Sequence, residues 1–361
     1  MHARVCSSRV AVITPDCLGT GVTVKVRFRL VPYRVVLALF LLSIVFEPAL
    51  VEAEGFGPFP VRNFHPIQQL VLNMPGDRAA VLKEGVLDVR VELAETATVF
   101  RDNSPQAVTT MKFETLRSGV FLRYGAAERW ELSVEVPVLY RSRGFMDGPI
   151  EAVERVTTGV SPARKALGSG YIFDISRGGR TIASGREGVV GLGDSTIMSK
   201  YQLLLETAAL PAVSIRTAVK LPTGDEGQFF GSGSPDFGFG LAAEKGFANR
   251  WVVYGNLNGV VPTGRIAGLT LHPTISGLLA VEYLWSENLS ITAQFDYYST
   301  PFRGVGTRVL DKGVTESVAG FSYRLTSYLL WQVYAVENLD FITGSAADFT
   351  LSTLLTYRLE S

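Results

Sequence analysis

The chain has 361 residues, of which 47% are hydrophobic and 19% are charged, and its 34 basic residues balance 34 acidic ones. This composition excludes a disordered chain and a polybasic nucleic-acid-binding protein. The 36 glycines, 21 phenylalanines and 13 tyrosines favour a protein of many strands and tight turns over a helical bundle.

The N-terminal region has the pattern of a secretory signal peptide. Basic residues precede an unbroken apolar run at 35–46. At about 1.5 Å per residue, this run is too short for a hydrocarbon core of roughly 30 Å, which argues against the alternative of a membrane anchor. Small residues occupy the −3 and −1 positions of Val51-Glu52-Ala53, so we expect residues 1–53 to be an upstream extension and signal, cleaved after Ala53.

The residues upstream of this signal, 1 to about 23, fit no part of the pattern, and we expect translation to start near Val22 or Val24. Both cysteines, Cys6 and Cys17, precede the cleavage site. The mature chain would then contain no disulfide and would need a large core or a closed sheet for stability. Such a secreted chain, rich in glycine and aromatic residues, points to the bacterial envelope.

Segment 54–85 shows no alternation of apolar and polar residues, and we expect a periplasmic tail or a segment inserted into a lumen. Within it, Asp77 as N-cap and Gly85 as stop predict a short helix over 78–85. A second short helix is predicted over 149–156.

From residue 86 to 361, apolar and polar residues alternate with the period of two that is typical of strands. The clearest segment runs from Trp130 to Tyr140, with an aromatic residue at each end of its apolar face. Its ten steps span about 33 Å, and a tilt of about 40° would place both rings at the edges of an apolar band of roughly 25 Å. Strands are predicted near 87–93, 120–124, 130–140, 201–205, 213–221, 236–245, 251–258, 273–286, 289–297, 319–325, 328–338 and 349–359.

The connections between these segments alternate in length. Short turns are predicted near 126–127, 207–208, 247–248, 286–287 and 326–327. Longer loops are predicted near 100–108, 142–192, 223–235, 262–272, 300–313 and 339–347. We therefore predict an all-β protein, a transmembrane antiparallel β-barrel of the bacterial outer membrane with about 12 strands, short periplasmic turns and longer extracellular loops.

Closure is the physical reason for a barrel, because lipid leaves the backbone groups of an open sheet edge without partners. The alternative is a secreted β-sandwich, in which the apolar faces would be buried. A sandwich explains the aromatic strand ends and the rhythm of turns and loops poorly.

Charges of both signs occupy the inward positions of the predicted strands. They should pair in a narrow lumen because an unpaired buried charge is costly, and Arg123 is expected directly opposite Glu131. These residues would form either a salt-bridged ladder that stiffens the barrel or the lining of a polar conduit or ligand pocket. The lumen-lining candidates are Arg123, Glu131, Glu135, Arg141, Arg216, Lys220, Glu244, Asp296 and Arg324. The candidate membrane-interface aromatic residues are Tyr124, Trp130, Tyr140, Trp251, Trp285, Tyr297 and Tyr357.

No motif predicts catalysis, a metal site or a cofactor. A lipid hydrolase would need His65 or His272 beside an inward serine, and neither stands in the His-x-Ser arrangement of outer-membrane phospholipases. The glycine-rich loop 231–235 lies near acidic residues, but their spacing matches no calcium loop, and we expect a flexible surface loop.

Several loop and strand-exit motifs carry a resemblance. They are Gly57-Pro58-Phe59-Pro60-Val61-Arg62-Asn63, Gly191-Leu192-Gly193-Asp194, Lys220-Leu221-Pro222-Thr223-Gly224-Asp225 and Gly231-Ser232-Gly233-Ser234-Pro235-Asp236. The chain resembles an uncharacterised bacterial outer-membrane β-barrel family, domain of unknown function 3187, and is similar to barrel proteins associated with phenol degradation. The resemblance implies an outer-membrane barrel and transfers no catalytic residue. Glu360-Ser361 departs from the usual barrel ending, where an aromatic terminus is common.

These observations predict a protein of the Gram-negative outer membrane that is not an enzyme. It would act as a narrow or gated passage, or a binding barrel, for small molecules, gated by loop 142–192 and by segment 54–85. An outer-membrane lipid hydrolase and a purely structural barrel are the alternatives. The expected partners are outer-membrane lipid and lipopolysaccharide, the barrel-insertion machinery and a small solute, with no nucleic acid.

Overall fold

The computed structural model of the protein describes residues 54–156, 159–339 and 347–360. The predicted signal peptide lies outside the described residues. No helix in these three ranges is long and apolar enough to cross a membrane.

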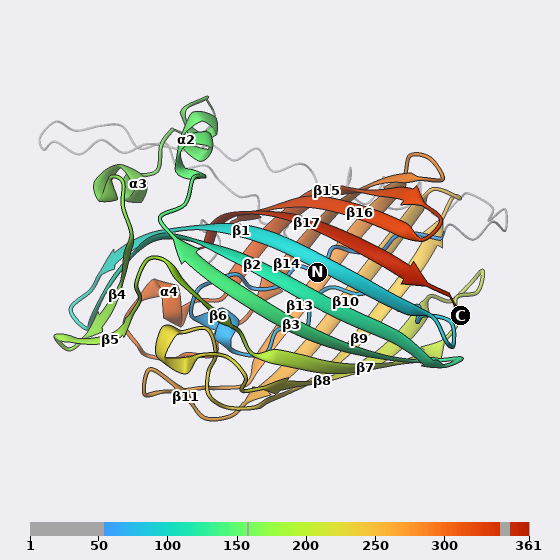
Figure 1. The fold of residues 1–361 in the computed structure, drawn as a ribbon, viewed down its shortest axis with the longest axis horizontal. Coiled ribbons are helices and arrows are strands. Elements are labelled where there is room, and N and C mark those ends of the chain that lie inside the picture. Colours follow the sequence, from blue (N-terminus) through green and yellow to red (C-terminus); the bar gives the residue numbers. More distant parts are fainter. Residues whose placement is uncertain (1–53, 157–158, 340–346, 361) are drawn as a thin grey trace, which may run out of the picture. The chain divides into compact units, whose positions relative to one another are not determined.

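Twelve antiparallel strands close into one barrel (Figure 1). They are β1 (Leu87–Asn103), β2 (Ala107–Ala127), β3 (Trp130–Ser142), β7 (Ser195–Leu204), β8 (Ala212–Leu221), β9 (Asp236–Phe247), β10 (Trp251–Pro262), β13 (Thr274–Leu284), β14 (Leu289–Tyr298), β15 (Val314–Thr326), β16 (Leu329–Asn338) and β17 (Ala347–Leu359). Pairing of β1 with β17 completes the ring. The predicted barrel of about twelve strands is confirmed.

The longer connections contain short elements of their own. These are α2 (Asp147–Val156), α3 (Pro162–Leu167), β4 (Ile172–Arg177), β5 (Arg180–Ser184), β6 (Val189–Leu192), η2 (Glu226–Gln228), β11 (Arg265–Ile266), β12 (Leu269–Thr270) and α4 (Arg308–Asp311). The predicted helix at 149–156 is confirmed within α2. The predicted long loop at 100–108 is wrong, because β1 and β2 continue as a paired ribbon as far as Asn103 and Val108.

The barrel wall is apolar outside and polar inside. Along β3, Val134 and Val136 are 37% and 40% exposed, whereas Glu135 between them is 3% exposed. The predicted interface aromatic residues also lie on the outer surface near strand ends: Tyr124, Trp130, Tyr140, Trp251, Trp285, Tyr297 and Tyr357. This arrangement excludes the sandwich, which would bury the apolar faces.

A charge placed on this outer surface should destabilise the barrel according to its depth. We expect Val134→Arg, in the middle of β3, to lower the free energy of unfolding in lipid vesicles by about 2–4 kcal/mol. Tyr140→Arg, near the strand end, should cost no more than about 1 kcal/mol, since its guanidinium reaches the interface. Denaturant unfolding monitored by tryptophan fluorescence measures both, and equal costs at the two positions would contradict a lipid-facing surface.

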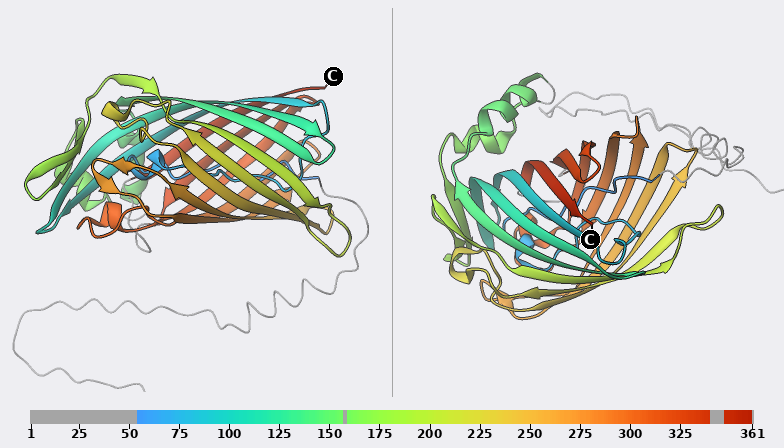
Figure 2. Two further views of the ribbon diagram at one scale, coloured as in Figure 1. Left: turned by 90° about the horizontal axis from the view of Figure 1, so that it is seen from below. Right: turned by 45° about the vertical axis from the view of Figure 1, so that its right-hand side comes forward.

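Residues 54–85, which we call the plug, run inside the ring of strands (Figure 2). The plug enters at the short-turn end, where the ring of Phe56 lies under the guanidinium of Arg324. It reverses at the single turn η1 (Gln68–Leu70), whose Gln68 side chain donates to the carbonyl oxygens of Val309 and Lys312. It then returns to the start of β1.

The helix predicted over 78–85 is wrong. The backbone amides of Ala79 and Leu82 donate instead to the carboxylates of Glu244 and Glu131 on the barrel wall, at 3.0 Å each. The wall carboxylates therefore supply the acceptors that a helix would have supplied.

Candidate functional site

The lumen is the site in which buried polar groups converge, and three charged clusters there hold the plug. The first joins Arg62 of the plug to Glu92, Arg117 and Glu135 of the wall. Arg62 Nη2 lies 3.4 Å and Arg117 Nη1 lies 2.9 Å from the same Glu92 oxygen, and both guanidinium groups contact Glu135. None of the four side chains is more than 7% exposed. Two cations therefore alternate with two anions.

The second cluster surrounds Asp77 of the plug. Its carboxylate lies 3.0 Å from Lys200 Nζ and 3.3 Å from Arg123 Nη2. Burial alone would raise the pKa of Asp77, but the adjacent Lys200 and Arg123 hold this pKa well below its usual range. The next plug residue, Arg78, lies 3.0 Å from Glu244. The plug is thus ionised and paired at this end of the lumen.

The third cluster centres on Lys220 of β8. Its ammonium group lies 3.1 Å from Asp194 and 2.8 Å from Asp236, and all three side chains are at most 5% exposed. The Leu72 amide of the plug donates to Asp236 Oδ2 at 2.9 Å.

The predicted register between β2 and β3 is wrong by two residues. Arg123 lies opposite Ser133, because β2 continues to Ala127 and the turn falls at 128–129 instead of near 126–127. The pairing also shifts by one residue between Gly125 and Ala127. The amide of Gly85, the last residue of the plug, donates to the carbonyl oxygen of Gly125, whose own amide donates to the carbonyl oxygen of Val86. Arg123 still reaches Glu131 diagonally, with Nη2 2.9 Å from Oε1.

Most of the other predicted lumen residues contact the plug or an inward loop rather than each other. Arg216 donates to the carbonyl oxygen of Pro75 and to Asn256. Asp296 accepts a hydrogen bond of 2.8 Å from Gln294, which also holds the carbonyl of Phe59. The remaining candidates, Glu135, Lys220, Glu244 and Arg324, lie in the contacts described above.

Arg141 differs from the other candidates because its contacts are with a loop. Its guanidinium donates to the carbonyl oxygens of Gln228 and Phe229 and lies 4.6 Å from the centre of the Phe230 ring. It therefore anchors the β8–β9 connection to β3.

Sequence reasoning missed several members of these clusters. Glu92, Arg117 and Lys200 had a detectable signal, because they occupy alternating inward positions of strands. Arg62, Asp77 and Arg78 had none, because the plug has no periodicity that would assign a face.

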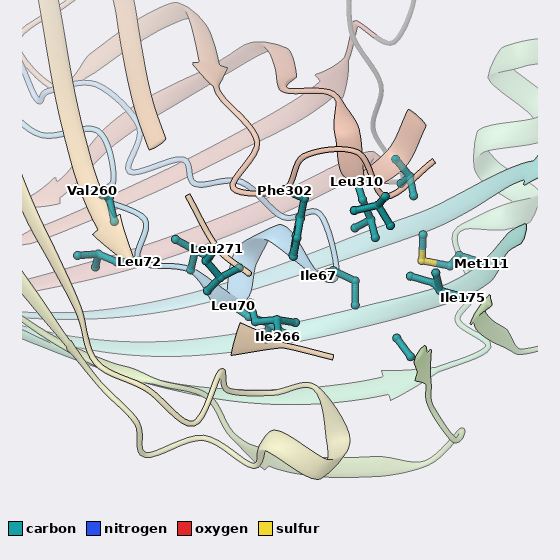
Figure 3. Packing of buried hydrophobic residues seen from close by; sticks show 14 of the residues in the cluster. Ile67, Leu70, Leu72, Met111, Ile175, Val260, Ile266, Leu271, Phe302 and Leu310 are labelled. Atoms are coloured by element: carbon teal, nitrogen blue, oxygen red, sulfur yellow. The ribbon is translucent and has the colours of Figure 1, made fainter. Parts of the chain in front are cut away.

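An apolar seal closes the long-loop end of the lumen (Figure 3). Ile67, Leu70 and Leu72 of the plug are each at most 4% exposed there. Their cluster includes Ile175 of β4, Ile266 of β11, and Phe302 and Leu310 of the 299–313 connection, together with Met111, Val260 and Leu271. The packing buries the apolar side chains around the reversal of the plug.

Two cavities between the plug and the wall are small, and a third, of about 100 Å³, lies at the short-turn end beside Arg78 and Arg324. One of about 50 Å³ is lined by Arg62, Asn73, Arg117, Asp194 and Lys220, among others. Another, beside Asn63 and Tyr298, measures about 20 Å³. Each can hold a few water molecules at most. With the plug in place, the cavities of about 50 and 20 Å³ have no room for a solute larger than water.

His65 stabilises the reversal of the plug as a neutral acceptor. Its Nδ1 accepts hydrogen bonds from the amides of Ile67 and Gln68 at 3.1 Å each. Neither His65 nor His272 hydrogen-bonds a serine within the described residues, so the geometry supplies no Ser-His pair for a hydrolase.

Acidification should therefore loosen the plug. Burial lowers the pKa of His65 from 6.5 to about 4, so the docked imidazole stays neutral while an undocked one takes up a proton below pH 6.5. The contribution of neutral His65 to the free energy of plug docking is fully present above pH 6.5 and is lost as the pH drops towards 4. At pH 5 the docked plug should be less stable by about 2 kcal/mol. Protease sensitivity of residues 54–85 should rise between pH 7.5 and pH 5. His65→Asn, which keeps an acceptor but cannot titrate, should flatten this dependence, and an unchanged profile would refute the role of His65.

Comparisons with known proteins agree with this fold. The family model described as "Protein of unknown function (DUF3187)" matches residues 35–359. A search of curated proteins found no match. Among solved structures, the COG4313 outer membrane channel from Pseudomonas putida F1 is 15% identical with a TM-score of 0.53, and the match covers 79% of this chain and 99% of that one. The NanC porin is 10% identical with a TM-score of 0.43, and the match covers 76% of this chain and 99% of that one. The KdgM porin is 9% identical with a TM-score of 0.39, and the match covers 75% of this chain and 98% of that one. The first of these matches shows that this chain has the fold of an outer-membrane channel.

Proposed function

The chain belongs to the DUF3187 family, and from this membership and the plugged lumen we propose that it is a small-molecule channel of the Gram-negative outer membrane, closed at rest by residues 54–85. The observation that carries the proposal is that ion pairs and hydrogen bonds to charged wall residues hold much of the plug. Water can replace the partners of Glu92, Glu131, Glu135 and Glu244 if the plug leaves, so the barrel can survive in an open state. If the plug served only to stabilise the barrel, apolar packing would stabilise it more than these contacts do, since buried ion pairs contribute little net stability.

The solved structure that shares this fold supports the same proposal. The COG4313 protein is an outer membrane channel, and this chain shares its fold over most of its length. The apolar exterior supports outer-membrane lipid and lipopolysaccharide as the surroundings and implies assembly by the barrel-insertion machinery. The solute would be small, because a barrel of twelve strands is narrower than the porins of sixteen or more.

Planar-bilayer recording of the purified protein tests the proposal. We expect brief openings over a closed baseline, as the plug leaves and returns. A barrel that remains silent in the intact form and after removal of the plug would be structural. No hydrolase is proposed, because the two histidines of the described chain lack the serine partner that this chemistry requires.

A further inference from the structure

Three of the sequence motifs that carried the family resemblance lie at or just beyond the long-loop ends of barrel strands. The structure brings these three together around Lys220, which is 3% exposed. Asp194 ends the motif at 191–194, Lys220 begins the motif at 220–225 and Asp236 ends the motif at 231–236. Ser232, from the glycine-rich part of this last motif, accepts from Lys220 Nζ at 2.6 Å. The prediction of a flexible surface loop at 231–235 is therefore wrong at Ser232, which is 2% exposed and binds this buried ionic centre.

This ionic centre binds the plug backbone on either side of Val71, at Leu70 and Leu72. The ammonium group of Lys220 donates to the carbonyl oxygen of Leu70. The carboxylate of Asp236 accepts from the amide of Leu72. The cation thus holds a plug acceptor and the anion holds a plug donor, next to the apolar seal.

The same ionic centre also binds the β8–β9 loop, residues 222–235. Asp194 accepts hydrogen bonds from the amides of Gly224 at 2.9 Å and Ser232 at 3.0 Å. A side chain at Gly231 would place its Cβ 2.4 Å from the Asp194 carboxylate and 2.8 Å from the Cα of Gly224. Glycine is required there because loop and carboxylate approach so closely. Asp194 makes no direct hydrogen bond to the plug among the described residues.

We propose that Lys220, Asp194 and Asp236 form a latch that couples the β8–β9 loop to the plug. The inference rests on the proposed channel function and names its regulation. Two carboxylates and one ammonium group are buried together, so loss of the loop contacts leaves charge without compensation and weakens the hold on Leu70 and Leu72. Coupling is reciprocal, so a molecule that draws the loop outward also favours release of the plug.

Cysteine labelling can test the latch without recording any current. The chain after residue 53 has no cysteine, so Val71→Cys, at a plug position that is 4% exposed, provides one buried thiol. The probe is a water-soluble maleimide applied to the full protein in proteoliposomes. Adding Asp194→Asn should raise the labelling rate about 5- to 150-fold, although Asp194 touches the loop and not the plug. Asp236→Asn, which touches Lys220 and the Leu72 amide of the plug directly, should raise the rate at least as much.

A matched control lies in the same loop. Asp225 accepts from the amide of Gln228 at the start of η2, and within the described residues its side chain has no hydrogen bond or ion pair with Lys220 or the plug. Asp225→Asn should therefore leave labelling within about twofold of the parent. Retention of the gel shift between unboiled and boiled samples shows that each barrel is folded. Should Asp194→Asn fail this check, Gly231→Ala disturbs the same loop contact without removing a charge and should give the same increase.

The outcomes separate the latch from the channel. Unchanged labelling in folded Asp194→Asn or Gly231→Ala overturns the latch, whatever the conductance of the intact protein. Equal acceleration by Asp225→Asn also overturns it, because the effect would then be general to the loop. Accelerated labelling in a protein that never conducts supports the latch and overturns the channel.

Discussion

Removing residues 56–79 is expected to convert a barrel that is mostly closed into one that conducts continuously, with a mean conductance about tenfold or more above that of the intact protein. These residues contribute Arg62, Asp77 and Arg78, which occupy the centre of the charged lumen. Without them the wall carboxylates and guanidinium groups face each other across space that water can fill. The wall strands pair with one another and keep their backbone hydrogen bonds, so the barrel itself should persist.

Planar-bilayer recording measures this effect, and the unboiled gel shift verifies that the deleted form is folded. The control is a deletion outside the lumen, that of residues 148–156 of α2. This helix lies in the long connection between β3 and β7. This deletion should leave the closed baseline unchanged. Equal conductance of the intact and plug-deleted proteins would show that the plug does not block the passage.

Among single substitutions, Arg62→Met should have the largest effect on the closed state. The change leaves Glu92 and Glu135 with one guanidinium group, that of Arg117, in a site where no side chain is more than 7% exposed. Breaking a buried charge pair in this way costs about 3–5 kcal/mol. Undocking the plug hydrates both carboxylates, so the plug should leave before the barrel unfolds. We expect an increase in open probability of at least about a hundredfold in planar bilayers.

The double variant Arg62→Met with Glu92→Gln provides the matched comparison. It restores a balance of one cation and one anion, Arg117 with Glu135, and should recover much of the closed state. Arg180→Met, at an exposed position of β5, removes the same type of charge away from the lumen and should change nothing. If Arg180→Met opened the channel as often as Arg62→Met does, the effect would be one of net charge.

The barrel itself followed from the sequence because each strand residue must face either lipid or lumen. Between Trp130 and Tyr140 the alternation is nearly strict, and the structure has the same parity along β3. The weaker segments near 236–245, 273–286 and 328–338 are also strands, as β9, β13 and β16. The inward charges were identifiable for the same reason, since parity assigns a face without any knowledge of the partner.

The plug could not be placed by such reasoning. Its amides and charged side chains are satisfied by residues far along the chain, such as Ala79 by Glu244 and Leu72 by Asp236. Local sequence signals therefore gave a wrong prediction here, since the capping pattern at Asp77 is not followed by a helix. The shift at Gly125 likewise coincides with a backbone hydrogen bond to Gly85 at the end of the plug, which no strand pattern contains.

The amino-acid sequence by itself determined the number of strands, the sidedness of the wall and the set of inward charges, because these depend on residue type and a local period of two. Tertiary structure alone decided that most of these charges hold a plug, and that Lys220 joins a loop to it. Ion pairing acts through space over a few ångströms, and its partners are chosen when the ring closes around the plug.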